Sequence, residues 1–342
     1  MSKTWWSKTK PIISLNCLFN VYVYSKKYIK KAFSLVEISI VILVIGIIIS
    51  GVFQSLSMIR NFKLSSARTL TQSSPVLGIK DLSLWLEATS ERSFITSEAS
   101  NKATISNWYD INDQRTKNRN SVSQLTEASK PIYIENAING LPAVYFDGVN
   151  DVLSKTNLLG SQLFRSNQVT IFIVQAFFND AYSVPTSFFW GNDSFETRLL
   201  IHAALGGTIY FDFGGSGGGP YYRISENIAD SFYNKPKVLS FLHDSSNYSE
   251  IRINKIMLAS DSSITNQLPT ESSYNMNIGA AQDNSGPSGF FRGHIGEIIV
   301  YDRALTKSER VAVENYLGQK WGISLENGDD KLPAAPRPIE DL

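Results

Sequence analysis

Cysteine is nearly absent from this chain of 342 residues, because the only one is Cys17. A single cysteine excludes an intramolecular disulfide and a zinc site built from cysteines. Methionine is also scarce, with four residues, whereas phenylalanine and tyrosine number 19 and 15. Aromatic side chains suit the half-buried surface of a sheet, so this composition favours β structure. A body outside the cytoplasm would have to be stable through its apolar core alone, which a chain of this length can provide.

Acidic residues are missing from the first 31 positions, which carry seven lysines. The rest of the chain holds the other 25 basic residues and all 31 acids, so its net charge is negative. A mildly acidic body gives no reason to expect nucleic acid as a partner. The lysines of the first 31 residues do not indicate nucleic-acid binding either, because they directly precede an apolar run.

From Ala32 to Phe53 the only formally charged residue is Glu37. As a helix, this run spans roughly 30 Å, the thickness of a bilayer core. A lone strand could not satisfy its backbone in lipid, so a helix is expected. The lysines on the N-terminal flank set that side in the cytoplasm by the positive-inside rule. The sequence therefore predicts a single-pass membrane protein whose head lies outside the cytoplasm.

Two simpler interpretations compete with a specialised helix. A cleaved secretory signal would have a shorter apolar region, about 7–15 residues, followed by small residues at the cleavage site. A plain uncleaved anchor fits the length but leaves Glu37 unexplained. A carboxylate within an apolar span costs about 2.5–3.5 kcal/mol on insertion scales, and less near an interface, so it marks a candidate functional site.

The segment 31–37, KAFSLVE, followed by an unbroken apolar run, resembles the N-terminus of type IV prepilins and pseudopilins. The resemblance implies that a prepilin peptidase cuts between Ala32 and Phe33 and that the new amine of Phe33 is methylated. It also implies that Glu37 assists assembly with other pilin-like subunits. Phe33 and Glu37 lie one turn apart on one helix face. Ala32 stands where the family usually has glycine, and the leader of 32 residues is long.

The chain is expected to divide into five parts. The Ser/Thr-rich stretch that begins at Ser65, followed by Pro75 and Gly78, is typical of a linker. We expect a basic leader at 1–32, the transmembrane and assembly helix at 33–64, a linker at 65–80, a β-sandwich head at 81–324 and a polar, Pro-containing tail at 325–342. We also expect the head, from Asp81 to Ser324, to fold alone.

Strand-like runs dominate the chain from Asp81 onward, with Leu82, Leu84 and Leu86 alternating with other residues. Clusters of Gly, Asn, Asp, Ser and Pro separate further runs at 142–146, 169–178, 197–203, 207–213, 237–243, 250–258 and 294–302. This spacing, without intervening helices, predicts an antiparallel sandwich or jelly roll.

One helix is expected near the C-terminal end of the head. Thr306 and Glu309 have the spacing of a capping box. An apolar face follows, and Gly322 stands at the expected C-terminal stop. The residues of that face are Val313, Tyr316, Leu317 and Trp321.

The head resembles the concanavalin A-like, laminin-G-like jelly rolls of bacterial surface proteins. The resemblance is carried by LWLEA at 84–88, WYD at 108–110, NGLPAVYFDG at 139–148, GEIIVYDRALT at 296–306 and KWG at 320–322. This family contains carbohydrate binders, protein binders and some glycan-cleaving enzymes, so the fold does not decide the function.

Signals for catalysis are weak. Glycan cleavage needs two carboxylates about 5–10 Å apart, and the cleaving relatives often carry Glu-x-Asp-x-x-Glu on one strand, a string that this chain lacks. Glu297 and Asp302 lie five apart, on opposite faces of a regular strand. His202, His243 and His294 each lie in a strand-like run, where a structural histidine is the commoner case. No Gly-x-Ser-x-Gly supports a serine triad.

Asp147, Asn150 and Asp151 surround Gly148 between two strands. Their oxygens are suited to calcium, but the same residues favour a hairpin turn for backbone reasons. The turn is favoured, and no other metal or cofactor is expected.

Two functions remain open. The first is a minor pilin or pseudopilin with a lectin-like head that binds glycan or protein, without enzymatic activity. The second is a surface glycan hydrolase tethered by the same helix. A close carboxylate pair in a groove of the head would favour the hydrolase.

Overall fold

The computed structural model describes residues 34–326, except 116, 118, 166, 179–184, 193–196, 215–222, 229–231, 265–267 and 269. The predicted leader and most of the predicted tail thus lie outside the described residues. The chain divides into two compact units, Met1–Gln54 and Ser55–Leu342.

The described part of the first unit is the N-terminal portion of helix α1 (Leu35–Gln72). Its most apolar window has a mean hydropathy of 2.8, and none of that window is buried inside the protein. The hydroxyls of Ser39 and Ser50 donate to carbonyls four residues earlier, at 2.8 Å, so the helix satisfies its own polar groups. Among the described residues only α1 is long and apolar enough to cross a bilayer, a property that a membrane anchor shares with a signal sequence.

The remainder of α1 belongs to the second unit and corrects the predicted linker. The helix does not end at Leu64 but continues to Gln72, and a 3-10 turn, η1 (Val76–Gly78), follows. The linker prediction is wrong because tertiary packing overrides the weak helix propensity of Ser and Thr. Ala67 and Val76 are buried in the core of the head, and several hydroxyls of this stretch bond to carbonyls four residues back.

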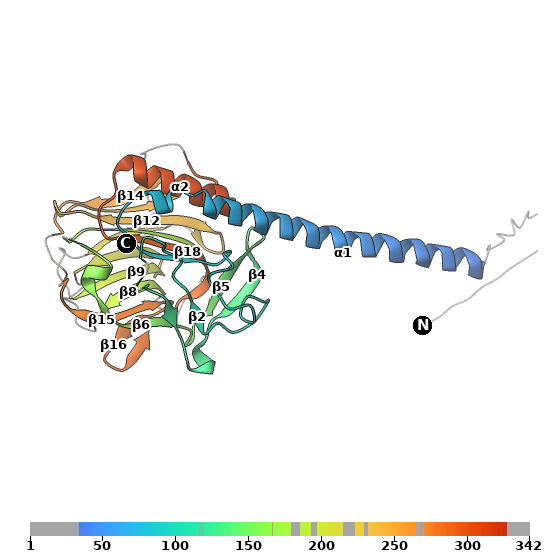
Figure 1. Cartoon of the computed structure of the whole chain (residues 1–342), viewed down its shortest axis with the longest axis horizontal. Helices are drawn as coiled ribbons and strands as arrows, with labels where there is room; N and C mark the ends of the chain where they lie inside the picture. Colours follow the sequence, from blue (N-terminus) through green and yellow to red (C-terminus); the bar gives the residue numbers. More distant parts are fainter. Residues whose placement is uncertain are drawn as a thin grey trace, which may run out of the picture. The chain divides into compact units, whose positions relative to one another are not determined.

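The head is built on two eight-stranded sheets, in which every strand pairing among the described residues is antiparallel (Figure 1). The first sheet has the order β14 (Ile256–Asp261), β13 (Ser249–Ile253), β12 (Lys237–His243), β7 (Val169–Phe177), β18 (Arg292–Tyr301), β5 (Leu141–Asp147) and β4 (Ile132–Ile138), with β1 (Leu82–Glu87) also paired to β18. The second has the order β11 (Arg223–Asn227), β10 (Thr208–Phe213), β9 (Arg198–Leu205), β8 (Thr186–Gly191), β15 (Ser273–Ile278), β6 (Leu153–Leu159), β3 (Val122–Ser123) and β2 (Asn107–Trp108). A small hairpin joins β16 (Ala281–Asp283) to β17 (Gly286–Ser288), and two 3-10 turns, η2 (Glu127–Ser129) and η3 (Gly160–Gln162), complete the described elements.

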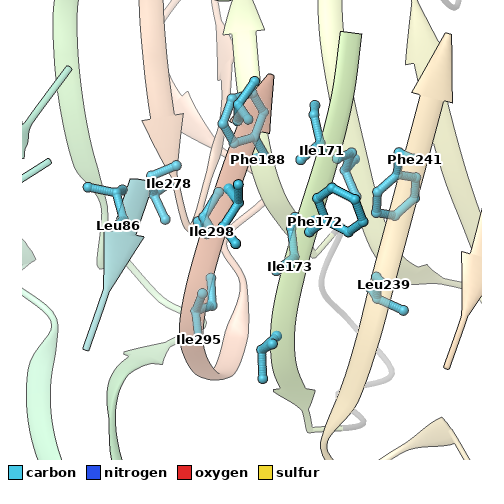
Figure 2. Close-up of a cluster of buried hydrophobic side chains, with 14 of the residues drawn as sticks. Leu86, Ile171, Phe172, Ile173, Phe188, Leu239, Phe241, Ile278, Ile295 and Ile298 are labelled. Atoms are coloured by element: carbon cyan, nitrogen blue, oxygen red, sulfur yellow. The ribbon is translucent and has the colours of Figure 1, made fainter. Parts of the chain in front are cut away.

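This arrangement confirms the predicted fold class, which is mainly antiparallel β structure with one long N-terminal and one C-terminal helix. The core lies between the sheets, where Phe188 and Ile278 of the second sheet belong to one buried cluster with side chains of β1, β7, β12 and β18 (Figure 2). All nine residues of β7 are buried. This central strand shows no alternation of exposed and buried positions because the second sheet covers one face and a helix covers the other.

The predicted strand at 250–258 is two strands, β13 and β14. The chain turns at Asn254 and Lys255, which both have positive φ, at 49° and 74°. Two-residue hairpins of this type require positive φ at both central positions and favour Asn-Gly. Lys255 occupies the second position, where glycine is usual, so the sequence does not indicate this turn. The other predicted runs fall on observed strands. The strands that were not predicted are β2, β3, β4, β6, β8, β11, β15, β16 and β17.

Helix α2 (Lys307–Trp321) has the predicted ends. The Thr306 N–H donates to Glu309 Oε2 at 2.9 Å, and Thr306 Oγ1 accepts from the Glu309 N–H at 3.4 Å. Gly322 adopts the left-handed conformation with φ of 60° and closes the helix. The expected apolar face is buried, and the helix lies on β12 and β7 of the first sheet (Figure 1).

Candidate functional site

Glu37 lies in the first turn of α1, as the sequence predicts. Its Oε2 accepts the backbone N–H of Ser34 at 2.8 Å, so the carboxylate caps the first turn of its own helix. Ala32 and Phe33, the predicted cleavage and methylation positions, lie outside the described residues. The role of Glu37 in assembly stays a prediction.

The connection between β5 and β6 places the candidate calcium residues together. Asp147 Oδ1 accepts from the N–H groups of Val149 at 2.8 Å and Asn150 at 3.2 Å, and Asp151 Oδ2 accepts from the Asp147 N–H at 2.9 Å. Burial raises the pKa of Asp151 to about 7, although the hydrogen bond from the Asp147 N–H opposes the rise. Within the described ranges no group of three or more His, Cys, Asp or Glu side chains is placed to hold a metal ion. These hydrogen bonds are those of the turn that the sequence favours.

The three histidines lie on separate strands. Burial lowers the pKa of His202 to about 3 and that of His243 to about 4. His202 Nδ1 lies 3.1 Å from Thr186 Oγ1, and His243 Nδ1 lies 2.7 Å from Ser249 Oγ. His294 packs against the rings of Tyr145 of β5 and of Phe178, which directly follows β7. The His243–Ser249 pair is almost inaccessible to solvent, since each residue is only 1% exposed.

A buried carboxylate pair lies where β1 meets β18. Glu87 and Glu297 are register partners, and Lys320 Nζ lies 2.5 Å from Glu87 Oε1 and 2.8 Å from Glu297 Oε2. All three side chains are 0% exposed. Glu297 also accepts from the indole N–H groups of Trp85 at 2.7 Å and Trp321 at 2.8 Å. Burial raises the pKa of Glu297, and the Lys320 ammonium opposes that rise.

This buried cluster is structural rather than open to a substrate. The Tyr316 hydroxyl donates to Glu297 at 2.9 Å and also contacts Thr71 of α1 at 3.4 Å. The cluster thereby joins α1, α2 and two strands of the first sheet. Asp302 lies beyond the end of β18 and pairs instead with Arg165 at 2.9 Å, so it shares no partner with Glu297. The cluster is not apparent from the sequence alone, although Trp85 and Glu87, two residues apart in LWLEA, and the Lys-Trp of KWG were its signals.

An open cleft runs between the second part of α1 and the segment 88–99. We call it the helix cleft. It has two lobes, of about 560 and 420 Å³, that share Arg68, Ser90 and Glu91. Arg68 Nε donates to the Thr89 carbonyl at 2.8 Å, and Arg68 is 2.5 Å from Glu91.

The walls of the helix cleft carry two further ion pairs. Arg60 lies 3.4 Å from Glu135 of β4, and Arg92 lies 2.6 Å from Asp113. All three pairs have side chains that reach solvent. The cleft is not apparent from the sequence, because its walls come from segments that are distant in sequence and because the composition of 65–72 predicts a linker. The recurrence of Arg60, Leu64, Arg68 and Gln72 every four residues was the available signal.

No protein-family model matches the chain, and no curated protein matches it. Several solved structures are partly similar. Domain 4 of AbnA, a GH43 extracellular arabinanase from Geobacillus stearothermophilus, gives a TM-score of 0.44 at 15% identity over 69% of this chain and 98% of that one. The Ruminococcus gnavus IT-sialidase CBM40 bound to α2,6 sialyllactose gives a TM-score of 0.38 at 14% identity, over 47% of this chain and 98% of that one. A mutant of NanB sialidase from Streptococcus pneumoniae gives a TM-score of 0.38 at 16% identity over 49% of this chain. The matched part spans only 26% of the length of that sialidase.

Proposed function

We propose that this chain is a pilin-like, single-pass surface protein whose β-sandwich head binds a glycan or protein ligand outside the cytoplasm. The observation that carries the proposal is a continuous apolar helix with a lone carboxylate, Glu37, in its first turn. Seven lysines precede this helix and orient its N-terminus towards the cytoplasm. A plain anchor has no use for a charge in such a span.

The assembly step follows from the position of Glu37. Cleavage by a prepilin peptidase between Ala32 and Phe33 creates a positive amine about one helical turn from this carboxylate. Within its own chain, Glu37 already accepts the Ser34 N–H, and a carboxylate has lone pairs left for further donors. The amine of a neighbouring pilin-like subunit supplies such a donor. In an apolar setting the pairing fixes the axial register of two helices, because a buried charge tolerates few alternative positions.

The head is proposed to bind rather than to cleave. A glycan hydrolase of the alternative kind needs two carboxylates facing a groove, about 5–10 Å apart. Glu87 and Glu297 are paired across β1 and β18, but both carboxylates are buried and both contact the Lys320 ammonium. The acids that line the helix cleft are each engaged by an arginine. These contacts support recognition of a ligand more than acid–base chemistry.

Protease treatment of intact cells and of spheroplasts tests the orientation. If the proposal is correct, added protease digests the head in intact cells or once the outer barrier is opened, while the lysine-rich N-terminus of unprocessed chains stays protected. A head that is digested only after the cytoplasmic membrane is broken would contradict the proposal.

A further inference from the structure

We propose that the helix cleft is the ligand site of the head and that it takes an uncharged oligosaccharide. This inference rests on the proposed glycan-binding function. It assigns that function to the junction of α1 with the segment 88–99, rather than to the face of a sheet.

The dimensions of the cleft suit a short chain of sugar rings. Its lobes of about 560 and 420 Å³ each fall within the range of roughly 300–1,000 Å³ that small-molecule sites occupy. Because both lobes share Arg68, Ser90 and Glu91, a ligand that fills both must cross the Arg68–Glu91 pair. A single ring occupies one lobe, so we expect affinity to rise with chain length.

The charges of the cleft point to an uncharged ligand. Its lining contains three arginines and three carboxylates, and each arginine is paired with one acid. An anionic or cationic ligand would therefore meet as much repulsion as attraction. A sugar with neighbouring hydroxyls uses both partners, since a guanidinium offers five donors and a carboxylate about four acceptor sites.

The cleft is also held in shape before any ligand arrives. Its floor includes Phe94 and Tyr133, whose rings meet edge to face with centroids 5.5 Å apart and which are 6% and 5% exposed. The Arg68 side chain is fixed by its bond to the Thr89 carbonyl. A prearranged site loses less conformational entropy on binding.

A saccharide fits these walls better than an extended peptide does. Peptides commonly bind by adding a strand to an exposed sheet edge. One wall here is a helix, and another is the segment 88–99, which contains turns and no strand. The edge strand β4 also lines the cleft, but the N–H and carbonyl groups of Tyr133 are already bonded to Ala103 and Lys102, so its backbone is not free to pair with a peptide there. Recognition must therefore come from side chains, as it does for sugar hydroxyls.

The test measures binding of detergent-solubilised full-length protein to an array of neutral hexasaccharides (gluco-, manno-, xylo-, arabino- and galacto-series), together with sialylated glycans and a random peptide library. Two cleft variants are compared with wild type. Ser90→Trp fills the junction of the lobes, and the double variant Arg68→Gln/Glu91→Gln removes the charges of the central pair while keeping size. The double variant Glu127→Gln/Lys130→Gln removes an ion pair outside the cleft and serves as the matched control. Thermal unfolding of each variant confirms that it is folded.

We expect wild type and the control to bind at least one neutral hexasaccharide with affinities within about twofold of each other, and each cleft variant to bind at least about tenfold more weakly, equivalent to 1.4 kcal/mol. If the folded cleft variants bind as wild type does, the site lies elsewhere and only the inference fails. Binding restricted to sialylated glycans would overturn the uncharged ligand. Binding of peptides alone, or of nothing, would reject the glycan-binding function itself.

Discussion

At the scale of single residues, Lys320 is the most constrained charge in the head. It lies between Glu87 and Glu297, and all three side chains are removed from water. Removing one charged partner from such a cluster leaves the opposite charge buried and unpaired, which lowers the stability of the fold by about 3–5 kcal/mol.

We therefore expect Lys320→Met to lower the free energy of unfolding by about 3–5 kcal/mol, measured by urea denaturation at pH 7. Lys235→Met, at an exposed position, is the control and should change it by less than about 0.5 kcal/mol. If both variants are as stable as wild type, the buried cluster does not hold the helices onto the first sheet.

Glu37 is the residue on which the assembly proposal depends. Glu37→Ala removes a charge from an apolar span and should ease membrane insertion by about 2–3 kcal/mol. We expect it to reduce incorporation into filaments without reducing the inserted fraction. Glu37→Gln keeps an acceptor for the Ser34 N–H but lacks the charge, so it should fail in assembly in the same way. Equal filament fractions for wild type and Glu37→Ala would favour a plain anchor.

At the scale of elements, the second part of α1 belongs to the head. Ala67 and Val76 are buried, and the Tyr301 hydroxyl donates to the Val76 carbonyl at 3.0 Å. A fragment that begins at Asp81 therefore exposes apolar surface that a fragment from Ser55 covers. We expect the fragment 55–326 to unfold cooperatively at a clearly higher temperature than 81–326. Equal midpoints in calorimetry would restore the boundary that the sequence predicts.

The N-terminal cap of α2 makes the stability of the head depend on pH. The Arg303 guanidinium, with bonds from Thr306, holds the pKa of Glu309 at about 2, below its ordinary value of 4.5. The stability that this charge contributes is complete above pH 4.5 and is lost as the pH falls towards 2. We expect Glu309→Gln to lower the unfolding temperature at pH 7 and to differ less from wild type at pH 2.5. A difference independent of pH would exclude this origin.

Local signals predicted the elements whose ends are determined by neighbouring residues. Thr306 with Glu309, and Gly322, defined α2 because caps act within a few residues. The extension of α1 beyond Leu64 had the four-residue recurrence of Arg60, Leu64, Arg68 and Gln72 as its only signal. The Ser and Thr residues of this stretch obscured that signal, because they become helical through contacts with segments that are distant in sequence. LWLEA and KWG contain residues of the Lys320 cluster, but their meeting depends on the register of β1 against β18 and on the packing of α2, which no local pattern specifies. The helix cleft depends in the same way on the packing of α1.

At the scale of the whole molecule, two separate units serve two proposed tasks. The apolar helix anchors and assembles, and the disulfide-free sandwich presents a ligand site. The assembly task requires that the mature chain begin at Phe33, since only cleavage after Ala32 provides the amine that pairs with Glu37 of a neighbour.

Intact-mass and N-terminal peptide mass spectrometry of the membrane-extracted protein, from cells with an active prepilin peptidase, tests this requirement most directly. The proposed function predicts a chain that begins at an N-methylated Phe33, and a loss of this species when the peptidase is inactive. A protein that still begins at Met1 in the presence of the active peptidase, or one that is cut on the far side of the apolar run, would contradict it.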